Sequence, residues 1–280
     1  MKVYTTRSDL SRYRDILVRQ GKSIGLVPTM GALHPGHTSL VDRSTAENDT
    51  TVVSIFVNPT QFNDPSDLKK YPRSPEKDLE LLRSCGADLI FLPSEEEMYP
   101  EEEHRIFDLG GLDETMEGAL RPGHFYGVTQ IVSKLFETVR PHRAYFGQKD
   151  FQQLVIVRHL VKLMNMDIRI IDCPIIRERD GLALSSRNVL LTPEQRQDAP
   201  FIYCTLVRAR ELSRTLIPRD VKAWVTLQFE QHATIELEYF EIVNDKNLEP
   251  VKSWSDQTNK VGCIAVRLGA TRLIDNMIFD

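Results

Sequence analysis

The sequence has few cysteines, no long hydrophobic run and no excess of positive charge, and each absence excludes a class of protein. The four cysteines among 280 residues lack C-x-x-C spacing, so a disulfide framework or a zinc site has no support. We expect reduced, buried thiols at Cys85, Cys173, Cys204 and Cys263. No stretch reaches the ~18 apolar residues of a membrane-spanning helix, and the N-terminus lacks the apolar segment of a signal peptide.

The charge balance also argues against one kind of partner. There are 35 Lys and Arg against 40 Asp and Glu, which gives a net charge of −5. Binding to nucleic acid needs a basic face that neutralises phosphates. We therefore expect no nucleic-acid partner, and the lack of a signal peptide and of a long apolar run predicts a cytoplasmic protein that binds no membrane.

The order of apolar runs predicts an α/β fold. Strands are expected at 23–27, 51–57, 88–93, 143–146 and 168–173, with a short one at 106–109, and helical patterns separate them. Strands that alternate with helices are typical of a parallel sheet. We predict a doubly wound, Rossmann-like α/β domain over residues 1–175.

The alternation of expected strands and helices ends after this region. Thr192-Pro193-Glu194-Gln195 has the pattern of a capping box with Pro at the first helical position, and helical and then β-rich segments follow. This order predicts a second, smaller α+β domain over residues 176–280. We expect it to cover the site formed by the loops described below.

A loop with two histidines follows the first of these strands. It reads P-T-M-G-A-L-H-P-G-H over residues 28 to 37, and Pro28 is expected to end the strand. A helix is expected to have Thr38 to Val41 as its first turn, so its free N–H groups would form an anion site. His34 and His37 are three residues apart and can face the same side. Exposed polar side chains are the alternative interpretation.

Other polar loops follow further strands. They are 58–61, 147–150 and 185–187, and the ends of parallel strands meet at one sheet edge. Histidines, a lysine, an arginine and hydroxyls suit the oxygens of a triphosphate. No G-x-x-x-x-G-K-[ST] occurs, so this would be a nucleotide site without a Walker A loop. His124, before another helix, could meet an anion or cap that helix.

At these residues the sequence resembles the pantothenate synthetase (pantoate–β-alanine ligase) family, within the superfamily of nucleotidyltransferases with an H-I-G-H signature. The matching stretches are P-T-M-G-A-L-H-P-G-H at 28–37, F-V-N-P-T-Q-F at 56–62, Y-P-R at 71–73, R-P-G-H-F at 121–125, A-Y-F-G-Q-K-D-F-Q-Q-L at 144–154 and D-G-L-A-L-S-S-R-N at 180–188. They cover most of the first two-thirds of the chain, and the last ninety or so residues carry little of the resemblance.

The resemblance implies a reaction in two steps. The carboxylate of (R)-pantoate attacks the α-phosphorus of ATP and pyrophosphate leaves. The amine of β-alanine then attacks the pantoyl-adenylate, which gives pantothenate, a precursor of coenzyme A, and AMP. ATP would bring Mg²⁺, for which no protein ligand is assigned, although Asp78 and Asp150 are candidates. The resemblance also implies a homodimer and no prosthetic group.

The resemblance also implies roles for individual residues. His34, His37 and Lys149 would act in catalysis, with His37 as proton donor. Gln61 would bind pantoate and β-alanine, and Gln153 would bind pantoate. The residues that would bind ATP are Met30, Gly31, Ala32, Leu33, His34, Pro35, Gly36, His37, Gly147, Gln148, Lys149, Asp150, Ile176, Leu184, Ser185, Ser186 and Arg187.

Two other functions compete with the ligase. A nucleotidyltransferase of the same superfamily would leave the nucleotide on its product instead of releasing AMP. A relative without catalytic activity would bind ATP or RNA, although the acidic balance disfavours RNA.

Overall fold

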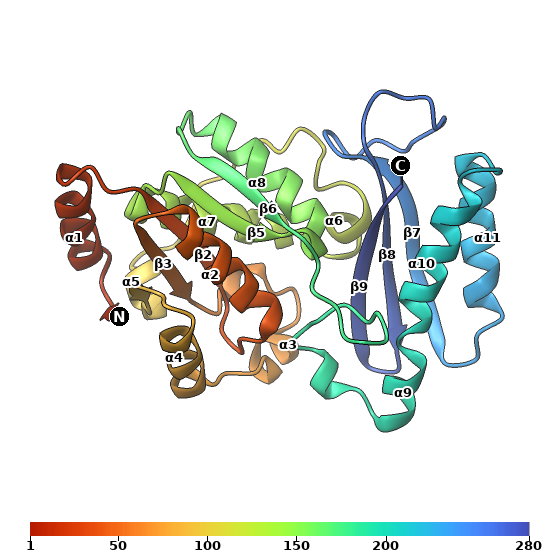
Figure 1. The fold of residues 1–280 in the computed structure, drawn as a ribbon, viewed down its shortest axis with the longest axis horizontal. Helices are drawn as coiled ribbons and strands as arrows, with labels where there is room; N and C mark the ends of the chain where they lie inside the picture. Colours follow the sequence, from red (N-terminus) through yellow and green to blue (C-terminus); the bar gives the residue numbers. More distant parts are fainter. Residues whose placement is uncertain (280) are drawn as a thin grey trace. The chain divides into compact units, whose positions relative to one another are not determined.

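The computed structural model describes residues 1–279, which form two compact units (Figure 1). The first unit comprises Met1–Gly147 and Ile156–Cys173, and the second comprises Gln148–Val155 and Pro174–Asp280. The predicted domain boundary after residue 175 stays a prediction.

The first unit is built from strands and helices that alternate along the chain. Its strands are β1 (Lys2–Tyr4), β2 (Ile24–Thr29), β3 (Thr50–Ile55), β4 (Leu89–Phe91), β5 (Arg143–Gly147) and β6 (Arg169–Cys173). Its helices are α1 (Arg7–Arg19), α2 (Pro35–Glu47), α3 (Pro65–Lys70), α4 (Pro75–Ser84), α5 (Glu95–Met98), α6 (Met116–Leu120), α7 (His124–Val139) and the end of α8 (Phe151–Leu163), with a 3-10 turn, η1 (Pro59–Gln61).

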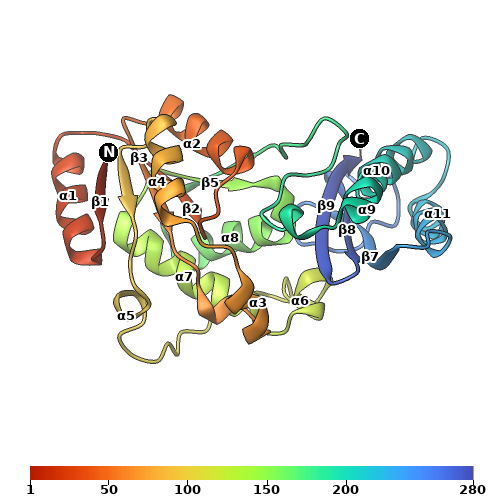
Figure 2. The ribbon, with the colours of Figure 1, turned by 90° about the horizontal axis from the view of Figure 1, so that it is seen from below.

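All six strands are parallel and lie in the order β1-β4-β3-β2-β5-β6. The chain steps outward from β2 to β3 and β4, and later crosses back to β5 and β6. Because crossovers between parallel strands are right-handed, these opposite steps place α2 and α4 on one face and α1 and α7, which contact each other, on the other. Figure 2 shows α2 and α4 above the sheet and α7 below it. This is the predicted doubly wound sheet.

The prediction that Pro28 ends its strand was wrong, because β2 continues to Thr29 and pairs Pro28 with Ser54 of β3. Successive residues of a strand turn their N–H groups to alternate neighbours. The amide of Thr50 bonds Ser23 O on the β3 side, and that of His142 bonds Ile24 O on the β5 side. Pro28 therefore faces β5, where pairing has already ended at Leu26, and no ladder bond is lost.

Further local expectations are corrected. Residues 106–109 form no strand, and β1, which has no periodic pattern, was missed. Helix α1 is capped by Thr6, whose side chain accepts the Asp9 N–H. Helix α2 begins at Pro35, about one turn earlier than expected, and α7 begins at His124 itself, which was expected to precede that helix.

The second unit packs helices against an antiparallel sheet. Its elements are η2 (Gln148–Asp150), the start of α8, η3 (Asn188–Leu190), α9 (Pro193–Asp198), α10 (Phe201–Leu212), α11 (Pro218–Glu230), β7 (Ile235–Asn244), β8 (Lys260–Leu268) and β9 (Thr271–Phe279). The sheet order is β7-β8-β9, and the capping box predicted at Thr192 is present. The predicted fold class, a parallel α/β sheet with a smaller α+β part, is confirmed.

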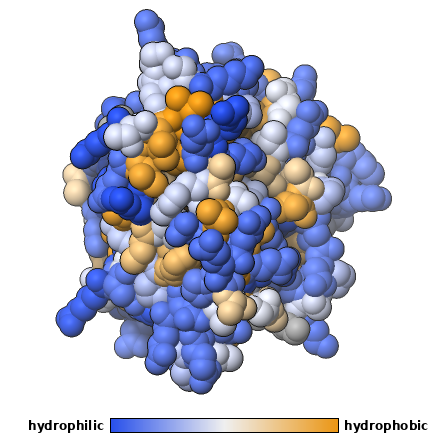
Figure 3. All heavy atoms as spheres, turned by 90° about the vertical axis from the view of Figure 1, so that its right-hand side faces the viewer, coloured by the Kyte–Doolittle hydropathy of each residue, from blue (hydrophilic) through white to orange (hydrophobic). Residues whose placement is uncertain are grey.

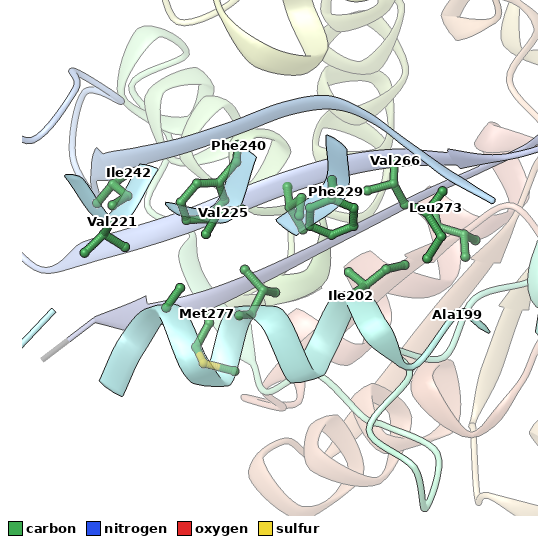
Figure 4. Packing of buried hydrophobic residues seen from close by; sticks show 14 of the residues in the cluster. Ala199, Ile202, Val221, Val225, Phe229, Phe240, Ile242, Val266, Leu273 and Met277 are labelled. Carbon is green, nitrogen blue, oxygen red and sulfur yellow. The ribbon is translucent and has the colours of Figure 1, made fainter. Parts of the chain in front are cut away.

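One hydrophobic core holds the second unit together. Figure 4 shows Ile202 of α10 and Val225 and Phe229 of α11 directed at Phe240 and Leu273 of the sheet, and all are at most 5% exposed. The face seen in Figure 3 is mainly hydrophilic, with hydrophobic residues in small separate groups.

Within residues 1–279, no helix is both long and apolar enough to cross a membrane. The four cysteines are free thiols, as expected. Only Cys173 and Cys263 are buried, whereas Cys85 is half-buried and Cys204 is exposed. The expectation of four buried thiols was therefore wrong for two of them.

Candidate active site

The two histidines form the N-terminal cap of α2. His34 is the N-cap residue, and its Nδ1 accepts the N–H of Gly36 at 3.1 Å. His37 is the third helical residue, and its Nδ1 accepts the N–H of His34 at 3.3 Å. The rings lie 4.1 Å apart between centroids, so both occupy the same side of the helix start.

This capping fixes where the imidazoles carry their protons. A ring nitrogen that accepts an N–H is unprotonated, so a neutral imidazole must carry its proton on Nε2. Both rings thus have an Nε2–H donor beside the positive end of a helix of 13 residues. Two such donors and a helix N-terminus suit the oxygens of a phosphate group.

A buried carboxylate holds the loop before this helix. Asp78 of α4 is 2% exposed, and it accepts the N–H of Ala32 at 3.0 Å and of Leu33 at 2.8 Å. Gly31 and Ala32 both have a positive φ, of 82° and 49°, which is costly for alanine. A Cβ on Gly31 would stand 3.0 Å from Asp78 Oδ2. No local pattern signals this contact, because it joins residues 46 positions apart.

Gln61 lies at the end of η1 and is 8% exposed. Its Oε1 accepts Asn58 Nδ2 at 3.2 Å, and its Nε2 lies 3.1 Å from Met30 Sδ. Asn58 also donates to Gly127 O at 3.0 Å and accepts the hydroxyl of Tyr99 at 2.6 Å. Burial raises the pKa of Tyr99 to about 12, so this hydroxyl keeps its proton and donates it. The structure thus brings Gln61 together with the histidine loop through Met30.

His124 does not cap its helix, and the anion contact that the sequence left open stays a prediction. Gly123 is the N-cap residue of α7, and His124 is 7% exposed. Its Nδ1 lies 2.8 Å from Gln61 O, and its Nε2 lies 3.2 Å from Arg121 Nη1. Because a carbonyl only accepts, Nδ1 carries the proton and Nε2 accepts from Arg121. His124 therefore supports the backbone of Gln61.

The second unit carries another set of predicted residues. Lys149 is half-buried and Asp150 is exposed in η2, directly after β5. Ser185, Ser186 and Arg187 are half-buried and precede η3. The N–H of Leu184 bonds Ile176 O at 3.0 Å, so Ser185 to Arg187 continue from one arm of a hairpin. That Lys149 and these residues meet the histidine loop around one ATP stays a prediction.

Two more predicted residues lie beside η2. Gly147 ends β5 with ordinary backbone geometry, and a Cβ on it would meet nothing within 4 Å. Gln153 is half-buried in the first turn of α8. Its role in binding pantoate stays a prediction.

The described residues offer no built metal site. No group of three or more His, Cys, Asp or Glu side chains within 1–279 is arranged to hold a metal ion. Both oxygens of Asp78 accept backbone N–H groups, so this candidate ligand is already used by the loop. Asp150 is exposed, and its role as a ligand of Mg²⁺ stays a prediction.

The sequence matches one protein family over almost its whole length. The model of the family described as pantoate-beta-alanine ligase matches residues 2–278. A pantothenate synthetase of Bacteroides fragilis is 54% identical over 277 residues, covering 99% of this chain and 98% of the relative. One of Porphyromonas gingivalis is 50% identical over the full length of both chains.

Solved structures agree with the sequence comparison. A crystal structure of pantothenate synthetase from Thermus thermophilus has a TM-score of 0.91 and 40% identity, covering 99% of both chains. That of pantoate-beta-alanine ligase from Francisella tularensis, complexed with beta-gamma ATP and beta-alanine, has a TM-score of 0.82 and 35% identity, covering 99% of this chain and 97% of the other.

Proposed function

The chain belongs to the pantoate–β-alanine ligase family, the pantothenate synthetases, and from this we propose that it joins (R)-pantoate to β-alanine through a pantoyl-adenylate. In the first step a pantoate carboxylate oxygen bonds to the α-phosphorus of ATP, and the bond to the bridging oxygen of pyrophosphate breaks. In the second step the β-alanine nitrogen bonds to the acyl carbon, loses a proton, and AMP leaves. The observation that carries the proposal is the pair of histidines that cap α2.

The histidine loop would serve the first step. Attack on the α-phosphorus brings negative charge onto the phosphate oxygens and onto the leaving pyrophosphate. The Nε2–H groups of His34 and His37 are donors that the cap already orients, so little reorganisation is needed when this charge develops. We assign the Nε2–H of His37 as a hydrogen-bond donor to the leaving pyrophosphate. Transfer of a proton would first require a second proton on Nδ1, which the cap bond from the His34 N–H occupies.

The second unit would hold the outer phosphates. Lys149 and Arg187 supply positive charge, and Ser185 and Ser186 supply hydroxyl donors, for the β- and γ-phosphate oxygens. Asp150 would accept from the ribose. The remaining ATP contacts are assigned to backbone and apolar atoms of Met30 to Gly36, Gly147, Gln148, Ile176 and Leu184.

The two glutamines would bind the acid. Gln61 is held by Asn58 and by its place beside Met30, so it presents one rotamer to a substrate. We assign Gln61 to pantoate and to the incoming amine, and Gln153 to pantoate. A primary amide both donates and accepts, which suits a substrate with carboxylate and hydroxyl groups.

Mg²⁺ is expected to arrive with ATP and to neutralise part of its charge, and phosphate oxygens are its usual ligands in such sites. We assign no protein ligand to it and no step that depends on one. The homodimer, the cytoplasmic location and the lack of nucleic-acid and membrane partners stay predictions.

An isotope experiment tests the proposal. Pantoate labelled with ¹⁸O in its carboxylate is incubated with ATP, Mg²⁺ and β-alanine, and the nucleotide is analysed by mass spectrometry. We expect AMP with one ¹⁸O, because the attacking oxygen stays with the phosphorus when the amide forms. ADP with labelled phosphate would refute the adenylate, and a product that retains AMP would favour the nucleotidyltransferase. In the His37→Ala, Lys149→Ala double variant, AMP formation at the unchanged rate would overturn the site assignment.

A single variant separates the cap from the chemistry. His34→Asn places an amide oxygen near the position of Nδ1, so Gly36 keeps its acceptor and the helix keeps a favourable N-cap. The variant lacks the Nε2–H donor. We expect unchanged thermal stability and a loss of about 10² to 10³ in the rate of adenylation, the usual cost of one oxyanion donor. If the melting temperature falls together with the rate of adenylation, the histidine acts only as a cap.

A further inference from the structure

A buried polar cluster in the second unit joins its two proposed phosphate-binding segments. Its members are Arg177, Asp275 and Asn276, which we call the Arg177 cluster. Asp275 and Asn276 are adjacent on β9 and are 4% and 5% exposed. None of the three was singled out from the sequence as a functional residue, and the substrate contacts proposed above include none of them.

Asn276 holds the segment that carries Lys149. Its Nδ2 donates to Gln148 O at 2.7 Å and to Lys149 O at 3.0 Å. Two consecutive carbonyls of η2 thus share the two N–H bonds of one amide. Because the side chain is buried, no water can replace these bonds without a change in the packing. The backbone from which the Lys149 side chain extends is fixed by β9.

Arg177 holds the hairpin that leads to Ser185. Its Nη1 donates to Gly181 O at 3.1 Å, at the turn of this hairpin, and its Nη2 donates to Asn276 O at 3.2 Å. The guanidinium also stacks over the Tyr203 ring, 4.4 Å from its centroid. Pairing of Arg177 with Ala183 then brings the second arm back toward Leu184 and Ser185.

Asp275 orients the guanidinium. Its oxygens accept Arg177 Nη1 at 2.6 Å and Nη2 at 2.9 Å, a bidentate pair. Burial raises the pKa of Asp275, and the charges of Arg177 and Lys149 act against that rise. A buried ion pair is weak evidence for stability, because apolar residues of similar size often stabilise as well. What apolar residues could not supply is the set of hydrogen bonds to the backbone of both segments.

We propose that Asn276, with the Arg177–Asp275 pair, is a positioning residue that holds the Lys149 segment and the Ser185–Arg187 segment in a fixed relation for the outer phosphates of ATP. This rests on the proposed function. None of the three side chains touches the phosphates in this proposal. Their effect is on where the backbone places the donors.

The test is a graded series at Asn276. Asn276→Ala removes both donors, and Asn276→Ser keeps a single hydroxyl donor. Asn259→Ala is the matched control, because Asn259 also donates one amide bond, to Asp245 at 2.8 Å, but is exposed and lies away from both segments. Hydrogen exchange of peptides that cover residues 147–155 and 176–188 is measured without substrate. The KM values for ATP and β-alanine are then compared.

We expect Asn276→Ala to speed exchange in the 147–155 peptide and to raise the KM for ATP by about 10- to 30-fold, the factor for two lost hydrogen bonds of about 1 kcal/mol each. The KM for β-alanine should stay within about twofold, because this substrate reacts after pyrophosphate has left. Asn276→Ser should lie between the wild type and Asn276→Ala, and it supplies the test if the alanine variant does not fold.

The proposal would be overturned if Asn276→Ala matched Asn259→Ala both in hydrogen exchange of the 147–155 peptide and in the KM for ATP. Equal rises in the KM for ATP and for β-alanine would do so as well, because they indicate a general loss of structure. The exchange measurement needs no substrate, so it tests whether the Arg177 cluster holds the two segments independently of the proposed function. Failure of the wild type in the ¹⁸O experiment would instead count against the proposed function.

Discussion

Replacing Asp78 with asparagine tests whether this carboxylate builds the histidine loop. The two side chains have nearly the same shape, so packing is kept. The carboxylate accepts two backbone N–H groups at 3.0 and 2.8 Å from Ala32 and Leu33. An asparagine amide can accept only one of them, and its NH₂ group must then face the other N–H.

The magnitude follows from these two bonds. A hydrogen bond to a charged group contributes about 1.5 to 3 kcal/mol, and a buried donor without a partner costs about 1 to 3 kcal/mol. We expect Asp78→Asn to destabilise the protein by about 2 kcal/mol. At about 2 to 4 °C per kcal/mol, this lowers the melting temperature by about 4 to 8 °C. The left-handed geometry of Ala32 would also relax, which moves His34 and lowers the adenylation rate by about 10²-fold.

The assay is thermal unfolding without ATP or Mg²⁺, followed by pantoate-dependent exchange of labelled pyrophosphate into ATP. Glu76→Gln is the matched control, because Glu76 is an exposed acid in the same first turn of α4 and interacts with the helix dipole alone. It should change stability by less than about 1 kcal/mol.

One outcome would refute the reasoning. If Asp78→Asn is as stable as Glu76→Gln, or more stable, the carboxylate does not hold the loop. A gain in stability is what removal of an uncompensated buried charge would give, as at a site that waits for a cation.

Two further changes have defined outcomes. Gly127→Ala should raise the KM for pantoate about 10-fold. The new Cβ would stand 2.3 Å from the backbone oxygen of Thr60 and 2.6 Å from the backbone nitrogen of Gln61, so it would push the Gln61 segment away. The Glu103 side chain is 11% exposed and lies 2.6 Å from Lys134, and although burial alone would raise its pKa, the hydrogen bond from Lys134 helps to hold it at about 2. This carboxylate stabilises the fold fully above pH 4.5, and its contribution is lost as the pH falls toward 2. Lys134→Met should cost about 3 kcal/mol at neutral pH and move acid unfolding to higher pH.

Each of these changes has an outcome that contradicts it. Helix propensity alone predicts that Gly127→Ala stabilises α7 by about 1 kcal/mol, so a more stable variant with the KM for pantoate unchanged would show that the close approach is unimportant. The exposed pair Arg208 and Glu211 is the control for Lys134→Met. A loss of stability as small as that of Arg208→Met, with no change in acid unfolding, would contradict the pH argument.

The sequence determined the parts of this protein that depend on neighbouring residues. Strands such as β3 are rich in β-branched residues and buried at every position, and the alternation of strands with helices predicted the parallel sheet. The histidine loop and the segments at Lys149 and Ser185 were found because glycine, proline and polar residues there mark strand ends and helix starts. The family was recognised from the same local motifs.

Tertiary structure decided what depends on contacts between distant residues. From the sequence Asp78 was a candidate ligand of Mg²⁺, and the fold places its carboxylate against the amides of Ala32 and Leu33. Asn276 and Asp275 lie in a β-rich segment like any other, and they matter because β9 runs beside η2. Local pattern specifies helices and strands through backbone geometry and the period of apolar residues. Which buried polar group meets which distant amide is decided by packing, because each such group needs a partner once water is excluded.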